Sequence, residues 1–553
     1  MATYELNGAL FADMVRGGAG NLRANAKTVN DLNVFPIPDG DTGDNMSLTM
    51  EGASAELRDI ASDSISYIAD KLARGMLLGA RGNSGVILSQ LFAGIAKGLS
   101  GVDRADAAAL GNAFTLGVKQ AYAAVMTPTE GTILTVAREA TEYATARITE
   151  KTTLEDFFSN FIREMRASLS RTPDLLPILK ESGVIDSGGA GLVYVIEGMS
   201  KILNGEAVEA AAPAAPVTNT PDFSTFTADS EMTFGYCTEF LLQLQNSKVE
   251  ADAFSADTLA AELADMGGDS IVCFKTGTII KVHVHTMTPG AVLSHCQQYG
   301  EFLTLKVENM TLQHSDTTID NRFEDSTPER QEHKAFGVVA VANGKGIKET
   351  FLSLGADVIV EGGQTMNPSS EDFLAAFDTV NADTVFVLPN NSNIVLTARQ
   401  AAALYKGADV RVLNSKTIGD GYAALTMLDF ESGDADAIEE ALTDAMSGVI
   451  TGLVTQSVRD SHLGGLDIAK NDYIGFAGKE MLADAKTAGE AACNLLAALD
   501  MTDREVLIAI CGKDTTAADM DAVRAFVRKT YPTVELFEIN GEQDIYNFIF
   551  VIE

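Results

Sequence analysis

The stretch from Asn33 to Met46 reads NVFPIPDGDTGDNM and is the most informative part of the chain. Its two prolines fix the approach of the backbone, and its two glycines permit tight turns. Asp39 and Asp41 stand two residues apart, so their carboxylates can point at one position, and carboxylate oxygens suit a hard cation such as Mg²⁺. Spacing alone favours an ordinary solvated turn. The lack of Glu at the twelfth position excludes an EF-hand calcium loop.

Two further glycine-rich loops lie downstream: GARGNSG (Gly79 to Gly85) and DSGGAG (Asp186 to Gly191). The first precedes an apolar helical stretch that opens at Val86. Backbone N–H groups at a helix N-terminus can bind phosphate without any basic side chain. The ordinary alternative is a helix–helix connection in which Ser84 caps the second helix.

The usual nucleotide fingerprints are missing. The Gly-Lys pairs at positions 478–479 and 512–513 lack the Ser or Thr that a Walker A loop requires. Any ATP site must therefore be of another kind.

The block that holds the three loops has a helical pattern. Ile65, Ile68, Leu72 and Met76 recur at helical spacing and predict one buried helix face. Leu10, Phe11, Met14 and Val15 show the same pattern in a first helix. We therefore expect an all-α domain over residues 1–206, followed by an Ala- and Pro-rich linker over 207–222.

The pattern changes after this linker. Apolar and alternating runs at 233–244, 269–277 and 278–286 predict strands of a small α/β domain over residues 223–318. A charged stretch at 319–334 predicts a second linker. Strands and helices then alternate over 335–553, which indicates a largely parallel sheet with crossover helices and possibly two subdomains.

Composition limits the function classes. The chain has 553 residues, with 40 basic and 77 acidic side chains, a net charge of −37. This balance disfavours nucleic acid and anionic membranes as partners. No apolar run reaches the length of a membrane span. Five cysteines and an N-terminus without signal-peptide features lead us to expect a cytoplasmic protein.

The expected middle domain contains a possible metal site. His283 and His285 lie two residues apart on a predicted strand, which puts both on one face. Cys237, on an earlier strand, could complete a Cys/His/His zinc site with an open fourth position. The alternative is a half-buried polar strand face, with Cys237 as a small core residue.

Several motifs together resemble a known family. NVFPIPDGDTGDNM, GARGNSGVILSQ, PTEGTILTVAREA and ESGVIDSGGAGL resemble, in that order, the nucleotide-binding domain of the dihydroxyacetone kinase family. The resemblance is closest to the ATP-binding subunits of bacterial fatty acid kinases. GYCTEF, IKVHVHT, EGGQTMNPS and LPNNSNI extend it over nearly the whole chain.

The resemblance implies an N-terminal eight-helix barrel that holds ATP with Mg²⁺ at its open end. Asp39 and Asp41 would be the catalytic, metal-bridging carboxylates, and Asn33 stands where dihydroxyacetone kinases carry a third Asp. Asp44 stands where most relatives have Thr. The residues expected beside the nucleotide are Thr42, Gly43, Asp44, Asn45, Asn83, Ser84, Thr129, Asp186, Ser187 and Gly188. Cys237, His283 and His285 would hold Zn²⁺.

The implied function is phosphorylation of the carboxylate of a fatty acid, presented by a separate fatty-acid-binding protein, to give an acyl phosphate. An ionised carboxylate acceptor needs no general base, and the first 282 residues contain no His. The resemblance also implies a homodimer, and it favours partner docking by the loops at 362–367 and 389–392. The alternatives are a small-metabolite kinase like dihydroxyacetone kinase, a non-catalytic nucleotide-sensing scaffold and, more remotely, a zinc hydrolase.

Overall fold

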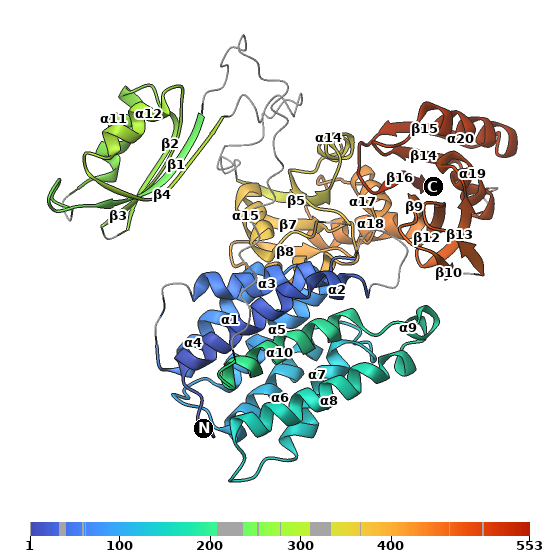
Figure 1. The fold of residues 1–553 in the computed structure, drawn as a ribbon. Helices are drawn as coiled ribbons and strands as arrows, with labels where there is room; N and C mark the ends of the chain where they lie inside the picture. Colours follow the sequence, from blue (N-terminus) through green and yellow to red (C-terminus); the bar gives the residue numbers. More distant parts are fainter. Residues whose placement is uncertain are drawn as a thin grey trace. The chain divides into compact units, whose positions relative to one another are not determined.

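The computed structural model describes residues 2–553 except 33–39, 58–59, 61, 207–235, 252–253, 277, 310–332, 365, 464, 500 and 502. The chain divides into two compact units, which are treated separately below. One comprises Met1–Ala211 with Arg330–Glu553, and the other comprises Ala212–Glu329 (Figure 1). Within the described residues, no helix combines the length and the apolar composition that a bilayer crossing needs.

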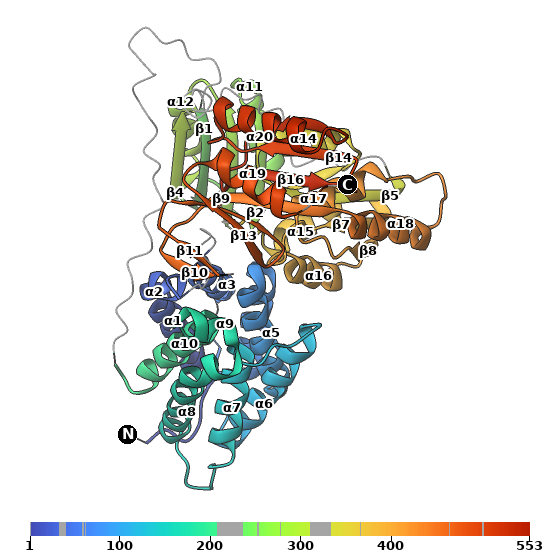
Figure 2. The same ribbon diagram turned by 90° about the vertical axis from the view of Figure 1, so that its right-hand side faces the viewer.

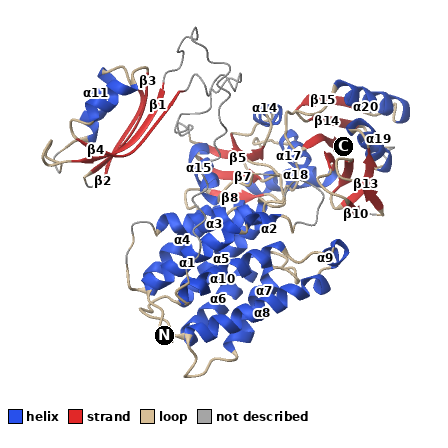
Figure 3. Cartoon of the chain, in the orientation of Figure 1, coloured by secondary structure: helices blue, strands red, loops and turns tan. Residues whose placement is uncertain are grey.

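The N-terminal part of the first unit is helical, as the sequence predicts (Figure 3). Two of its helices have five and six residues, α2 (Ala26–Asn30) and α9 (Pro177–Ser182). Eight are longer: α1 (Gly8–Ala24), α3 (Thr42–Glu56), α4 (Ile65–Gly79), α5 (Gly82–Gly98), α6 (Ala107–Ala124), α7 (Ile133–Thr145), α8 (Leu154–Leu175) and α10 (Ser187–Leu203). The long helices contact one another in the sequence α1, α3, α4, α5, α6, α7, α8, α10, and α10 returns to α1 (Figure 2).

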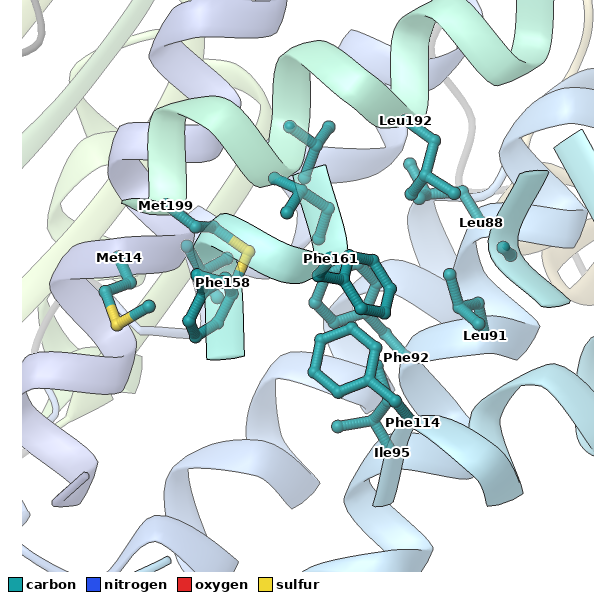
Figure 4. Close-up of a cluster of buried hydrophobic side chains, with 14 of the residues drawn as sticks. Met14, Leu88, Leu91, Phe92, Ile95, Phe114, Phe158, Phe161, Leu192 and Met199 are labelled. Carbon is teal, nitrogen blue, oxygen red and sulfur yellow. The ribbon is translucent and has the colours of Figure 1, made fainter. Parts of the chain in front are cut away.

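Apolar side chains from these helices form one core. The predicted faces of α1 and α4 are confirmed, because Phe11 and Met76 are almost completely buried together with their helical neighbours. Phenylalanines fill the middle of this core (Figure 4). The rings of Phe114 and Phe161 meet edge to face with centroids 4.9 Å apart, a favoured aromatic geometry. The core fixes the helices, and hence the loops at their ends.

The C-terminal part of the first unit begins with a parallel sheet of order β6-β5-β7-β8. Alternate residues of the central strand β5 enter two different cores, so apolar material covers both faces, as in other crossover sheets. Lys334, the last residue of the predicted second linker, opens β5. The elements are β5 (Lys334–Ala342), α14 (Lys345–Ser353), β6 (Val358–Glu361), α15 (Ser370–Val380), β7 (Ala382–Leu388), α16 (Val395–Leu404), β8 (Asp409–Val412), α17 (Ile418–Thr426) and α18 (Ala435–Gly448).

A second sheet, of order β13-β12-β9-β16-β14-β15, corrects the prediction of a largely parallel domain. Only the β14–β15 pairing in it is parallel among the described strands. The turn Gly478–Lys479 explains part of this, because a two-residue connection can join only antiparallel neighbours. The elements are β9 (Ile450–Gln456), β10 (Ser461–Leu463), β11 (Leu466–Ile468), β12 (Tyr473–Ala477), β13 (Glu480–Ala485), α19 (Ala488–Ala498), β14 (Val506–Cys511), α20 (Ala517–Thr530), β15 (Glu535–Asn540) and β16 (Tyr546–Ile552).

The second unit is a small α/β domain with an antiparallel sheet of order β2-β3-β1-β4. Val282 and Val284 of β3 are fully buried, as expected. The predicted linker 207–222, and residues 319–332 of the other, lie outside the described residues. The elements are β1 (Tyr236–Leu244), α11 (Ala256–Asp265), β2 (Asp269–Thr276), β3 (Ile279–Thr286), α12 (Pro289–Cys296) and β4 (Gly300–Asn309); α12 and β4 were not anticipated.

Candidate nucleotide and metal site

Asp41 forms the N-cap of α3, and its side chain does not cap the helix. Its carboxylate Oδ2 instead accepts a hydrogen bond from Asn367 Nδ2 at 2.5 Å. Asp39 and Asn33 lie outside the described residues, so the pairing of Asp39 with Asp41 stays a prediction. A group of three or more His, Cys, Asp or Glu suited to a metal is absent from the described part of the chain. Mg²⁺ needs only one or two carboxylates besides phosphate oxygens.

The first turn of α3 is held by Asn30, a residue that the sequence motifs did not single out. Asn30 Oδ1 accepts from the Gly43 N–H at 2.7 Å, and Asn30 Nδ2 donates to Asp44 Oδ2 at 2.9 Å. This contact gives Asp44 a structural partner and occupies the Gly43 N–H. A role for either group on a phosphate stays a prediction.

The predicted phosphate loop ends in α5, which starts at Gly82, earlier than expected. Arg81 is the N-cap residue, so the alternative in which Ser84 caps this helix is wrong. Gly82 has φ +57°, in the left-handed region that favours glycine. A Cβ at Gly82 would lie 2.7 Å from Asn45 Nδ2. Gly82 therefore lets the α5 N-terminus lie against buried Asn45 of α3.

The turn before α7 contains Thr129, which is exposed. Thr132 Oγ1, from the N-cap residue of α7, donates to the Thr129 carbonyl at 2.7 Å. Glu130 accepts from Thr135 Oγ1 at 2.6 Å and from Arg138 at 3.0 Å. These bonds fix the turn that carries Thr129.

Asp186 caps α10 by accepting from the Gly189 N–H at 2.6 Å. Burial raises the pKa of the Asp186 carboxyl from its usual 3.8 to about 6, against the lowering effect of hydrogen bonds from the Gly189 and Ile133 backbones. Asp186 therefore connects α10 to the first residue of α7. The next residue, Ser187, donates through Oγ to Thr42 Oγ1 at 3.2 Å.

These contacts bring four helix N-termini together. Ser187–Thr42 joins α10 to α3, Asn45–Gly82 joins α3 to α5, and Asp186–Ile133 joins α10 to α7. The N-cap residues of α3, α5 and α7 make no side-chain cap bond. Helix N-termini carry partial positive charge and unsatisfied N–H groups, so their convergence suits a polyanion such as a triphosphate. Together with the Asp41 carboxylate, this donor set fits a nucleotide with Mg²⁺.

The expected phosphate residue Asn83 has a different partner in this structure. Its Nδ2 donates to Asn393 Oδ1 at 3.2 Å, in the loop that follows β7. Ser84 and Gly188 lie in the first turns of α5 and α10, near the convergence. A contact of these residues with nucleotide stays a prediction.

Cys237, His283 and His285 lie on paired strands of the second unit. The register places Cys237 directly opposite His285, and His283 opposite Glu239. The backbone therefore brings the three predicted zinc ligands to adjacent positions on β1 and β3.

Family comparisons cover most of the chain. Residues 36–201 match the DAK2 domain, residues 233–317 the FakA-like middle domain of fatty acid kinases, and residues 337–553 the FakA-like C-terminal domain of the same kinases. Protein YloV of Bacillus subtilis is 40% identical over 557 residues, which covers 99% of each chain. The chain belongs to the FakA-like fatty acid kinase family.

Members with other names are also similar. An uncharacterized protein of Staphylococcus haemolyticus is 39% identical, over 99% of this chain and 100% of its own. Among solved structures, the dihydroxyacetone kinase of C. freundii in complex with AMP-PNP and Mg²⁺ aligns with 35% of this chain and 34% of its own, with 19% identity and a TM-score of 0.28. The family points to a kinase that uses ATP, in agreement with the donor set of the site.

Asp186→Asn tests the electrostatics of this fatty acid kinase-like site. Because the folded-state pKa of Asp186 is raised to about 6, its contribution to stability is present below pH ~4 and is lost as pH rises through ~6. Asn keeps an acceptor for the Gly189 N–H but does not titrate. Between pH 5 and 7.5 we expect the wild type to lose about 1 kcal/mol of unfolding free energy relative to the variant. Chemical denaturation at both pH values measures this.

Exposed Asp70 of α4 provides the matched control, since Asp70→Asn makes the same change of charge. It should follow the wild-type pH dependence. Parallel pH dependences for wild type and Asp186→Asn would contradict the raised pKa.

Proposed function

We propose that this chain is the ATP-binding subunit of a kinase that phosphorylates a fatty acid carboxylate presented by a separate fatty-acid-binding protein. The observation that supports the proposal most is the convergence of the N-termini of α3, α5, α7 and α10 beside Asp41. The family adds the acceptor class. We further propose that the ring of eight long helices is the expected barrel, with the nucleotide at the end where these N-termini meet.

The chemistry requires little beyond position and charge. A carboxylate oxygen of the acid attacks the γ-phosphorus of ATP, the bond from that phosphorus to the β–γ bridging oxygen breaks, and ADP leaves. The acid is already ionised near neutral pH, so no proton has to be removed. This agrees with the absence of His from the first 282 residues. Mg²⁺, when bound, neutralises charge on the β- and γ-phosphates.

We assign roles to the chain's own residues accordingly. Asp41, with Asp39 and Asn33, would hold the metal. The hydroxyls of Thr42 and Ser187 and the first N–H groups of α5 would bind phosphate oxygens. Asp186 orients the first turn of α10 through the Gly189 N–H.

The fatty acid is expected to arrive on a second protein. The cavity at the carboxyl ends of β5, β6 and β7 has a volume of about 60 Å³ and is lined mainly by apolar surface, with Asn390 and Gln364 among its polar groups. Ligand pockets usually enclose about 300–1,000 Å³. This cavity can hold a few water molecules but not an acyl chain.

Reconstitution tests the proposal. The full chain, ATP and Mg²⁺ are mixed with an oleate-loaded fatty-acid-binding protein, and acyl phosphate is trapped by hydroxylamine as the hydroxamate. We expect hydroxamate and ADP in equal amounts, and neither without the second protein. ATP consumption with a small metabolite alone would favour the dihydroxyacetone-type kinase. Nucleotide binding without any turnover would favour the scaffold.

We also propose that Cys237, His283 and His285 bind Zn²⁺, since the strand register places Cys237 opposite His285. Three N and S ligands with an open fourth position are typical of zinc. The purified chain should contain about one zinc per chain by elemental analysis, and Cys237→Ser should lose most of it. Cys493→Ser, at a half-buried cysteine of α19, should keep it. Equal zinc in both variants would contradict the site.

A further inference from the structure

The loop between β6 and α15 contacts the predicted phosphate loop within the same compact unit. Arg81 Nη1 donates to the Asn367 carbonyl at 2.8 Å, and Arg81 forms an antiparallel bridge with Ser369. The Ser370 N–H donates to the Ala80 carbonyl at 3.3 Å. The Arg81 guanidinium is therefore engaged by this loop.

The loop has its own anchor. Ser369 caps α15 in a capping box with Asp372, and the Gly363 N–H donates to the Met366 carbonyl at 3.0 Å. Asn367 lies two residues before the cap, between these fixed points. Its position is thus determined by the C-terminal part of the chain, 326 residues from Asp41.

The Asn367 side chain is 3% exposed. Its Nδ2 donates to Asp41 Oδ2, and because a carboxylate can only accept here, the amide cannot be turned around without losing this bond. The other end, Oδ1, is buried and has no hydrogen-bond partner among the described residues. A buried carbonyl left unsatisfied costs about 1–3 kcal/mol.

A hydrated divalent cation on Asp41 would remove this cost. Mg²⁺ keeps several of its water ligands, and those waters donate hydrogen bonds to nearby oxygens. An amide that donates to the ligating carboxylate and accepts from a metal-bound water matches both ends of Asn367. Such partners of metal ligands fix the orientation of the ligand and tune its affinity.

We propose that Asn367 is a positioning residue of the metal site, so that the C-terminal domain completes a site built mainly in the helical domain. The inference rests on the proposed function, in which Asp41 is a metal carboxylate. Asn367 orients Asp41 through Nδ2 and accepts from the hydration shell of the cation through Oδ1.

Mn²⁺ binding to the full chain tests this directly, because free Mn²⁺ is measured by electron paramagnetic resonance in the presence of AMP-PNP and without turnover. Asn367→Ala should weaken Mn²⁺ binding by about 10- to 100-fold. Gln400→Ala is the matched control: Gln400 joins the same two parts of the chain, by donating to the Leu77 carbonyl at 2.8 Å and accepting from Gln90 at 2.7 Å. It should change Mn²⁺ affinity less than threefold.

An affinity of Asn367→Ala within twofold of the wild type would overturn the inference, and so would equal losses in Asn367→Ala and Gln400→Ala. If Asn367→Ala does not fold, Asn367→Ser, which removes the amide but stays polar, is measured against the same expectation. Asp41→Asn separates the two levels of the account. Unchanged Mn²⁺ affinity in Asp41→Asn would overturn the proposed metal site itself, whereas a loss there without a loss in Asn367→Ala would overturn only the role of Asn367.

Discussion

Asp41→Asn is expected to lower the rate of acyl phosphate formation by about 100- to 1,000-fold, the usual cost of removing one group that stabilises transition-state charge. The substitution keeps the size of the side chain and an oxygen that can accept from Asn367. It removes the negative charge that would hold Mg²⁺ against the phosphates. Partner-dependent hydroxamate formation, with saturating ATP, measures the rate.

The control for Asp41→Asn is again Asp70→Asn, which changes the net charge equally on the exposed side of α4. It should retain the wild-type rate. A rate for Asp41→Asn within threefold of the wild type, in a variant that is folded by circular dichroism, would show that Asp41 does not act on the metal.

Gly43→Ala is expected to have the second-largest effect. A Cβ at this position would lie 2.3 Å from the Ala26 carbonyl oxygen and 2.9 Å from Ala26 Cα. These are backbone atoms, so α3 has to move away from α2 by about 1 Å, the distance between such an overlap and an ordinary contact. Misplacement of that size can lower catalysis about 100-fold, because Asp41 and Thr42 move with the helix.

Stability should also fall in Gly43→Ala, by about 1–3 kcal/mol of unfolding free energy, although Ala is the better helix former. Denaturant unfolding measures this. Gly448→Ala is the control, since a Cβ on Gly448, at the end of α18, would meet open space. It should be neutral or slightly stabilising. A Gly43→Ala variant as stable and as active as Gly448→Ala would contradict the close packing of α2 on α3.

The helical part of the fold could be predicted because its signal is local. The spacing of Ile65, Ile68, Leu72 and Met76 is a property of fifteen residues of α4, and a helix buries its apolar face whatever it packs on. The second C-terminal sheet was not predictable in the same way. Strands such as β14 and β16 have the same apolar composition in parallel and antiparallel pairings, and the pairing depends on contacts distant in sequence.

The candidate site shows the same division. Asp41, Thr42, Gly82 and Asp186 could be placed near helix N-termini from glycine-rich motifs. The roles of Asn30 and Asn367 could not, because a lone Asn in a loop resembles any turn residue. Only the folded chain shows that Asn30 reaches Gly43 and Asp44, and that Asn367 reaches Asp41.

A crystal structure of the full chain with AMP-PNP and Mg²⁺ tests the central claim most directly. The account predicts the γ-phosphate at the joint N-termini of α3 and α5, with a phosphate oxygen within about 4 Å of the Asp41 carboxylate, since both would bind one Mg²⁺ at about 2 Å. A nucleotide bound elsewhere on the chain, or a triphosphate at this place with its metal remote from Asp41, would contradict it.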